Sequence, residues 1–86
     1  MIKEGFILRR MIGYNIVISI GAQKKEMGEM VMLNDTGALI FEGLQAGKSI
    51  DQVVECLMAE YDVARDTAIA DIENIIVDLR EVGVME

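Results

Sequence analysis

The segment LNDTGALIFEGL (residues 33–44) joins a short apolar run to a helical pattern through an Asn-Asp-Thr-Gly corner. The first turn of a helix leaves backbone N–H groups without partners inside the helix. An Asn or Asp side chain at such a corner can accept hydrogen bonds from them. The segment therefore predicts a strand that ends at Leu33, held in a fixed relation to a helix over residues 35–45.

Before this corner the chain alternates in the manner of strands. Residues 6–12 and 14–20 are rich in β-branched residues and are separated by Gly13, which predicts an antiparallel hairpin. Arg9 and Arg10 fall on opposite faces of the first strand, which favours an edge position. Residues 21–29 are polar and predict a loop, and residues 30–33 predict a third, short strand. The alternating apolar residues are Phe6, Leu8 and Ile12, followed by Tyr14, Ile16, Ile18 and Ile20.

Two helices are predicted directly after the corner. Gly47 is placed to end the first. The second begins at Ser49, which can form a capping box with Gln52. The expected inner side chains of the first helix are Leu39, Ile40, Phe41 and Leu44, and the apolar stripe of the second is Val53, Val54, Leu57, Met58 and Tyr61.

A third helix is predicted over about residues 65–82, with Gly83 ending it and Val84 folding back on Leu79. One apolar seam repeats at alternating spacings of four and three, which is sufficient for a core-facing helix. Its members are Ala68, Ile72, Ile75, Leu79 and Val82, and the apolar residues outside it are Ile69, Ile76 and Val77. These three residues are interpreted either as a broad core face or, for Ile69 and Ile76, as the lining of an exposed groove.

Length and charge limit the classes of protein. A chain of 86 residues fits one domain over residues 1–86, too small for a deep catalytic cleft of its own. A net charge of -7 disfavours nucleic acid and anionic membranes as partners. Residues 1–33 hold five basic and three acidic residues, whereas residues 34–86 hold three basic and twelve acidic residues. The single Cys56 is expected to be a reduced core side chain, and no apolar run could span a bilayer, so the chain is expected in the cytoplasm.

The residue types that carry most enzyme chemistry are missing or scattered. The chain has no His and a single Cys, so neither a common general base nor a Cys/His metal cluster is available. Its glycines form no phosphate-binding loop. The sequence therefore predicts a protein that is not an enzyme and needs neither a cofactor nor a metal.

Several segments in this order and spacing resemble the PqqD family, named after coenzyme PQQ synthesis protein D. The resemblance rests on residues 33–40, 49–54, 60–63 and 71–84 and covers about residues 6–86. It implies an α+β fold, a small winged helix-turn-helix with a three-stranded antiparallel sheet followed by three helices. One departure is Ala64, where the family usually has a capping residue; Asp66 is expected to cap the third helix instead, two residues later.

The resemblance also implies a function: capture of the leader of a ribosomally made precursor peptide and its presentation to a modifying enzyme, typically a radical SAM protein, as in PQQ biosynthesis. The leader would bind as an added strand beside the third strand, in the groove between that strand and the third helix. Carried over by position, the peptide-binding residues are Glu29, Met30, Val31 and Met32 on the strand and Ile69, Glu73 and Ile76 on the helix. Ordinary core packing remains the alternative for Met30 and Met32.

Two other functions stay open at this point. The same strand edge could pair with a second copy of the chain, giving a homodimer or structural module. A winged helix could also bind DNA, but the third helix carries Arg65 and Arg80 against five carboxylates. A further hypothesis is that Glu73 and its neighbours favour peptides carrying Lys or Arg.

Overall fold

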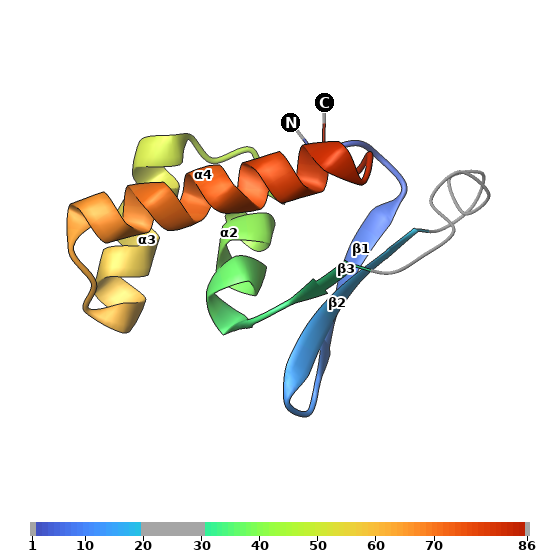
Figure 1. Ribbon diagram of the computed structural model, residues 1–86, viewed down its shortest axis with the longest axis horizontal. Helices are drawn as coiled ribbons and strands as arrows, with labels where there is room; N and C mark the ends of the chain where they lie inside the picture. Colours follow the sequence, from blue (N-terminus) through green and yellow to red (C-terminus); the bar gives the residue numbers. More distant parts are fainter. Residues whose placement is uncertain (1, 20–30, 86) are drawn as a thin grey trace.

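The computed structural model describes residues 2–19 and 31–85. Within these residues, six elements follow one another (Figure 1). They are the strands β1 (Phe6–Met11), β2 (Tyr14–Ser19) and β3 (Val31–Leu33) and the helices α2 (Asp35–Gln45), α3 (Ile50–Tyr61) and α4 (Arg65–Glu81). This confirms the α+β fold of a three-stranded antiparallel sheet followed by three helices. The predicted loop over 21–29 and the strand ends at Ile20 and Met30 lie outside the described residues.

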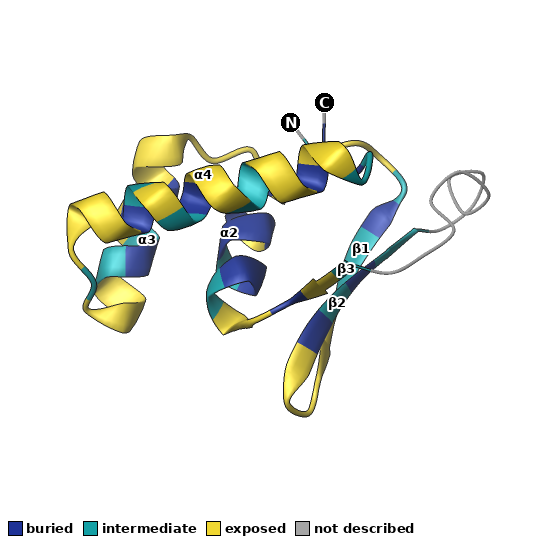
Figure 2. Cartoon of the chain, viewed as in Figure 1, coloured by how far each residue is buried: buried dark blue, intermediate teal, exposed yellow. Residues whose placement is uncertain are grey.

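The three strands form a sheet in the order β1-β2-β3, and both pairings are antiparallel. In the hairpin, Met11 lies opposite Tyr14, and Gly13 takes a positive φ of 86° at the turn. Ile12 belongs to this turn rather than to β1 and is fully exposed, at the hairpin tip visible in Figure 2. The order leaves β1 and β3 at the two edges of the sheet, which confirms the edge position inferred for β1.

The buried face of β2 is not the face that carries its isoleucines. Asn15 and Val17 are buried, whereas Ile16 and Ile18 lie on the opposite face and are only half-buried. Alternate residues of a strand point to opposite sides of a sheet, so only one of the two sets can face the helices. The alternation of apolar residues was therefore misleading here, because a polar residue occupies a core position.

The buried side chain of Asn15 on β2 forms hydrogen bonds to both sides of the corner between β3 and α2. It is 2% exposed, and its Nδ2 donates to the Leu33 carbonyl at 3.3 Å and to Asp35 Oδ1 at 3.0 Å. Asn34 caps α2, since its Oδ1 accepts the Gly37 N–H at 2.8 Å. The predicted corner is thus confirmed, and its amide and carboxylate groups fix the end of β3 against the start of α2.

The limits of α2 and α3 match the sequence pattern closely. Gly47 follows α2 with a φ of 85°, and Ser49 and Gln52 form the predicted capping box, with bonds of 3.2 Å and 2.8 Å. Tyr61 was wrongly assigned to the apolar stripe, because it is 41% exposed. Tyr61 is the last residue of α3, and the C-cap that follows it, Asp62, has a left-handed backbone conformation.

Helix α4 begins at Arg65, so the expectation that Asp66 caps it was wrong. Ala64 occupies the cap position with extended backbone angles, and no side chain bonds to the first turn. At the other end the predicted Schellman motif is confirmed. The Val84 N–H donates to the Leu79 carbonyl at 2.9 Å and the Gly83 N–H to the Arg80 carbonyl at 3.2 Å.

The missing cap of α4 makes a testable prediction. Replacing Ala64 with serine should stabilise the protein by about 1 kcal/mol, because the hydroxyl can accept an unpaired N–H of the first turn. This corresponds to a rise in Tm of about 4–8 °C for a protein of this size. Thermal unfolding followed by circular dichroism measures the shift. Ala70→Ser, inside the exposed face of α4, is the control and should be slightly destabilising; equal shifts for both variants would contradict the prediction.

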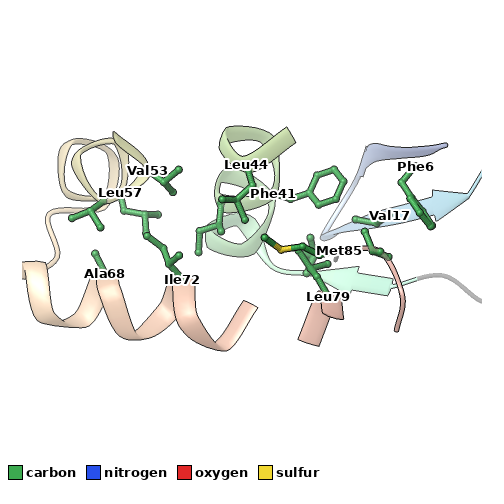
Figure 3. Close-up of a cluster of buried hydrophobic side chains, with 14 residues drawn as sticks. Phe6, Val17, Phe41, Leu44, Val53, Leu57, Ala68, Ile72, Leu79 and Met85 are labelled. Carbon is green, nitrogen blue, oxygen red and sulfur yellow. The ribbon is translucent and has the colours of Figure 1, made fainter. Parts of the chain in front are cut away.

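One apolar core joins the sheet to the helices. Figure 3 shows Phe41 extending from α2 toward Val17 and Phe6 of the sheet, while Leu57 and Ala68 meet between α3 and α4. The two ends of the described chain also meet, since Ile2 and Met85 form an isolated bridge and the Lys3 N–H donates to the Val84 carbonyl at 2.9 Å. The helices are therefore anchored to the sheet through the core and through these ends.

Candidate functional site

The edge strand β3 has a side without a partner. Among the strands of residues 2–19 and 31–85, only β2 pairs with it. An edge of this kind presents backbone N–H and C=O groups to an extended chain. Val31 and Leu33 turn toward the helices and are half-buried and buried, whereas Met32 points away and is 68% exposed. The strand thus offers backbone groups along its edge and a large apolar side chain on its outer face.

A pocket of about 170 Å³ lies between the corner and α4. Its lining comes from two places in the sequence, the first turns of α2 with their cap and the middle of α4. The lining residues are Asn34, Thr36, Gly37, Ile40, Asp71, Asn74 and Ile75. Because Asn34 directly follows Leu33, the pocket opens at the end of β3.

Gly37 lets α4 come close to this corner. A Cβ atom at Gly37 would lie 3.2 Å from Ile75 Cδ1 and 3.2 Å from Leu33 Cβ, tighter than ordinary contact. The absent side chain leaves room for Ile75 to pack over the start of α2. The apolar floor of the pocket is made in this way by Ile40 and Ile75, and its rim is polar.

The structure separates the site residues predicted on α4 from this pocket. Asp71, Asn74 and Ile75 line it, and Ile69, Glu73 and Ile76 do not. Residues five positions apart in a helix differ by about 140° around its axis. Ile69 and Asn74, and likewise Asp71 and Ile76, therefore lie on different flanks of α4.

The predicted residues have other surroundings. Ile69 and Ile76 are half-buried against the core, as a broad core face requires, and Glu73 is exposed. Val31 and Met32 lie on the free edge strand, while Glu29 and Met30 fall outside the described residues. A role for the predicted set in binding stays a prediction. Sequence periodicity identified the core side of α4 but held no signal for which flank faces the corner at the start of α2.

The pocket carries one carboxylate, that of the half-buried Asp71. Among the described residues that line it, none is Lys or Arg. Ion pairs in the described part of the chain, such as those of Arg10 with Glu42 at 2.6 Å and of Arg65 with Glu55 at 2.9 Å, involve other residues. A positively charged group entering the pocket would meet a carboxylate without displacing a neighbouring cation.

A second pocket, of about 130 Å³, lies between α2 and α3. Cys56 is half-buried on its wall, with Lys48 Nζ at 3.6 Å from its sulfur, so the expectation of a core cysteine was wrong. The helices α2 and α3 lie close together beside this pocket, because Gly43 has no side chain: a Cβ there would lie 2.9 Å from Cγ2 of the buried Val53.

The described part of the chain, residues 2–19 and 31–85, holds neither a metal cluster nor a membrane-spanning helix. No three His, Cys, Asp or Glu side chains are grouped there so that they could hold a metal ion. None of the described helices is long and apolar enough to cross a membrane.

The fold and the site define a class of protein: a small α+β protein with a free sheet edge beside a polar-rimmed pocket on its last helix. The chain belongs to the PqqD family, because the family model for coenzyme PQQ synthesis protein D matches residues 16–85. No curated protein sequence matches it.

Two solved structures share the fold. One is TbiB1 in complex with the TbiA(beta) leader peptide, with a TM-score of 0.79 and 21% identity over 99% of this chain and 93% of that one. The other is lasso peptide synthetase B1 complexed with the leader peptide, with a TM-score of 0.77 and 29% identity over 96% of this chain and 92% of that one.

Proposed function

We propose that this protein is a peptide-binding adaptor without catalytic activity. It binds the leader of a ribosomally made precursor peptide as an added strand on β3 and presents the peptide to a modifying enzyme. The observation that carries the proposal is the edge of β3 with which no other described strand pairs, beside the pocket on α4. Membership of the PqqD family and two similar structures that hold leader peptides support it.

Strand addition divides recognition into two parts. Backbone hydrogen bonds along the edge give affinity for an extended peptide of many sequences, and pockets for alternate side chains give selectivity. On the outer face of β3, Met32 adds to the affinity, because its flexible and polarisable side chain adapts to different apolar neighbours. The pocket at the corner suits the second.

The enzyme served would carry out the chemistry that this chain lacks. The absence of His from the chain, together with a single Cys, leaves few groups for acid–base or nucleophilic catalysis. In this family the partner is typically a radical SAM enzyme, and the same class of partner is proposed here. The proposal includes a cytoplasmic location, which ribosomal synthesis of the peptide and the free Cys56 support.

Selection from a library of random 15-residue peptides by mRNA display on the immobilised full chain tests the function. An enriched peptide should bind in calorimetry and slow amide hydrogen exchange in β3 and at the pocket. The other sheet edge, β1, is the internal control and should exchange unchanged. Protection of β1 instead would overturn the assignment to β3, and a selection without any enriched binder would overturn the adaptor function.

A second copy of the chain is the competing occupant of the same edge. Light scattering with and without an enriched peptide distinguishes the two. The adaptor should be monomeric in both states, whereas a dimer closed through β3 should dissociate as the peptide takes its place.

A further inference from the structure

We propose that the pocket between the corner and α4 receives a Lys or Arg side chain of the bound peptide, so that the protein selects leaders with a basic residue at one position. This inference rests on the proposed function and adds the side chain that the site reads. It concerns the flank of α4 that carries Asp71 and Asn74, not the flank predicted from the sequence.

The lining of the pocket matches both parts of a long basic side chain. Ile40 and Ile75 form an apolar floor against which an aliphatic stem can lie. At the rim, the carboxylate of Asp71 and the side-chain oxygens of Thr36 and Asn74 are acceptors for N–H groups. The Oδ1 of Asn34 already accepts the Gly37 N–H, so Asn34 contributes mainly by holding the corner in place.

Charge decides between a basic and a neutral occupant. Asp71 is half-buried, and the lining residues within 2–19 and 31–85 include no Lys or Arg that would compete for it. A hydrogen bond to a charged group contributes more to binding than one between neutral groups. A carboxylate on the peptide would instead meet like charge on a protein of net charge -7. The pocket therefore favours Lys or Arg and rejects Asp or Glu.

The geometry of an added strand confines this preference to one position. Successive side chains of a strand point to opposite faces, so neighbouring peptide residues turn away from the pocket. The corner ends β3 at Leu33, and the pocket opens directly beyond it. We therefore expect one basic residue, at a fixed number of positions from the peptide residues that pair with β3. We do not expect a peptide that is basic throughout.

The test repeats the mRNA-display selection with random 15-residue peptides on three full-length proteins: the natural chain, Asp71→Lys and Glu73→Lys. The two variants change the net charge equally but on different flanks of α4. The natural chain and Glu73→Lys should enrich peptides with Lys or Arg at one aligned position. Asp71→Lys should lose this preference and enrich Asp or Glu there.

Calorimetry with one enriched peptide gives the magnitude. Replacing its aligned basic residue with norleucine, or making Asp71→Asn in the protein, should weaken binding roughly tenfold, and combining both changes should add little. Circular dichroism checks that each variant is folded, and Asp71→Asn keeps the shape of the side chain if the charge reversal unfolds the protein.

Enriched peptides without an aligned basic residue would overturn this inference and leave the proposed function standing. A basic preference that Glu73→Lys removes and Asp71→Lys retains would move the specificity to the other flank and also overturn it. If no peptide is enriched by the natural chain, both the inference and the proposed function fail.

Discussion

Asn15→Asp is expected to destabilise the protein by about 3–5 kcal/mol at neutral pH, although it replaces a carboxamide by a carboxylate of nearly the same shape. The Asn15 amide is buried and donates to the Leu33 carbonyl and to the Asp35 carboxylate. A carboxylate at position 15 cannot donate to either and would face Asp35 as a like charge. The loss therefore comes from an uncompensated buried charge and not from altered packing.

The pH dependence of this loss has a definite sign. Burial and the facing carboxylate should raise the folded-state pKa of the introduced carboxyl above its unfolded value of about 3.9. The folded variant then binds more protons than the unfolded one, so its stability falls as the pH rises between these two pKa values. Below about pH 4 the carboxyl is protonated in both states, and most of the electrostatic penalty disappears.

Urea denaturation at pH 4 and pH 7, compared with the natural chain at each pH, measures both effects. Asn74→Asp makes the same chemical change at an exposed position of α4 and is the matched control, with an expected change within about 0.5 kcal/mol. A similar small change for Asn15→Asp at pH 7 would mean that water reaches this side chain and that the bonds at the corner contribute little.

Phe41→Ala is expected to cost about 3–5 kcal/mol at any pH near neutral. Phe41 is fully buried, and its ring extends from α2 toward Val17 and Phe6 of the sheet, with which it shares the core (Figure 3). Truncation removes the transfer free energy of the ring and leaves a cavity that the two layers can close only by moving together. A protein of this size has a total stability of about 4–13 kcal/mol, so a large part of it would be lost.

Urea denaturation followed by circular dichroism checks the Phe41 prediction. Val77→Ala, at an exposed position on α4, is the control and should change stability by less than about 0.5 kcal/mol. An equal loss for both variants would contradict the prediction, because alanine favours the helix more than Phe or Val does and burial of the ring would then not account for the loss.

The features that the sequence predicted well are those decided by neighbouring residues. The corner at Asn34, the capping box at Ser49 and the ending at Gly83 each depend on backbone groups within a few positions of the side chain or the glycine that satisfies them. Local chemistry of this kind does not depend on how the layers pack. The limits of the three helices could therefore be placed within about a residue of those observed.

The features that the sequence missed depend on partners far along the chain. The burial of Asn15 depends on Leu33 and Asp35, which come 18 and 20 positions later, and no alternation within β2 reveals them. In the same way, Asp71 lines the pocket because α4 crosses the start of α2 beside Gly37. Periodicity fixed the buried side of α4 through Ala68 and Ile72, but both flanks are compatible with that seam.

The bridge between Ile2 and Met85 brings the two ends of the described chain together, which makes insertion into a host protein and circular permutation possible. Because Ile2 and Met85 lie side by side, this domain could be inserted into a surface loop of a host protein without distorting the domain or the host (Figure 1). Joining these ends and reopening the chain at Gly13 would give a circular permutant with the same pairings in the sheet and new ends at the hairpin tip. Peptide recognition could then be joined to an enzyme through the natural ends or through the new ends, with β3 and the pocket left as they are.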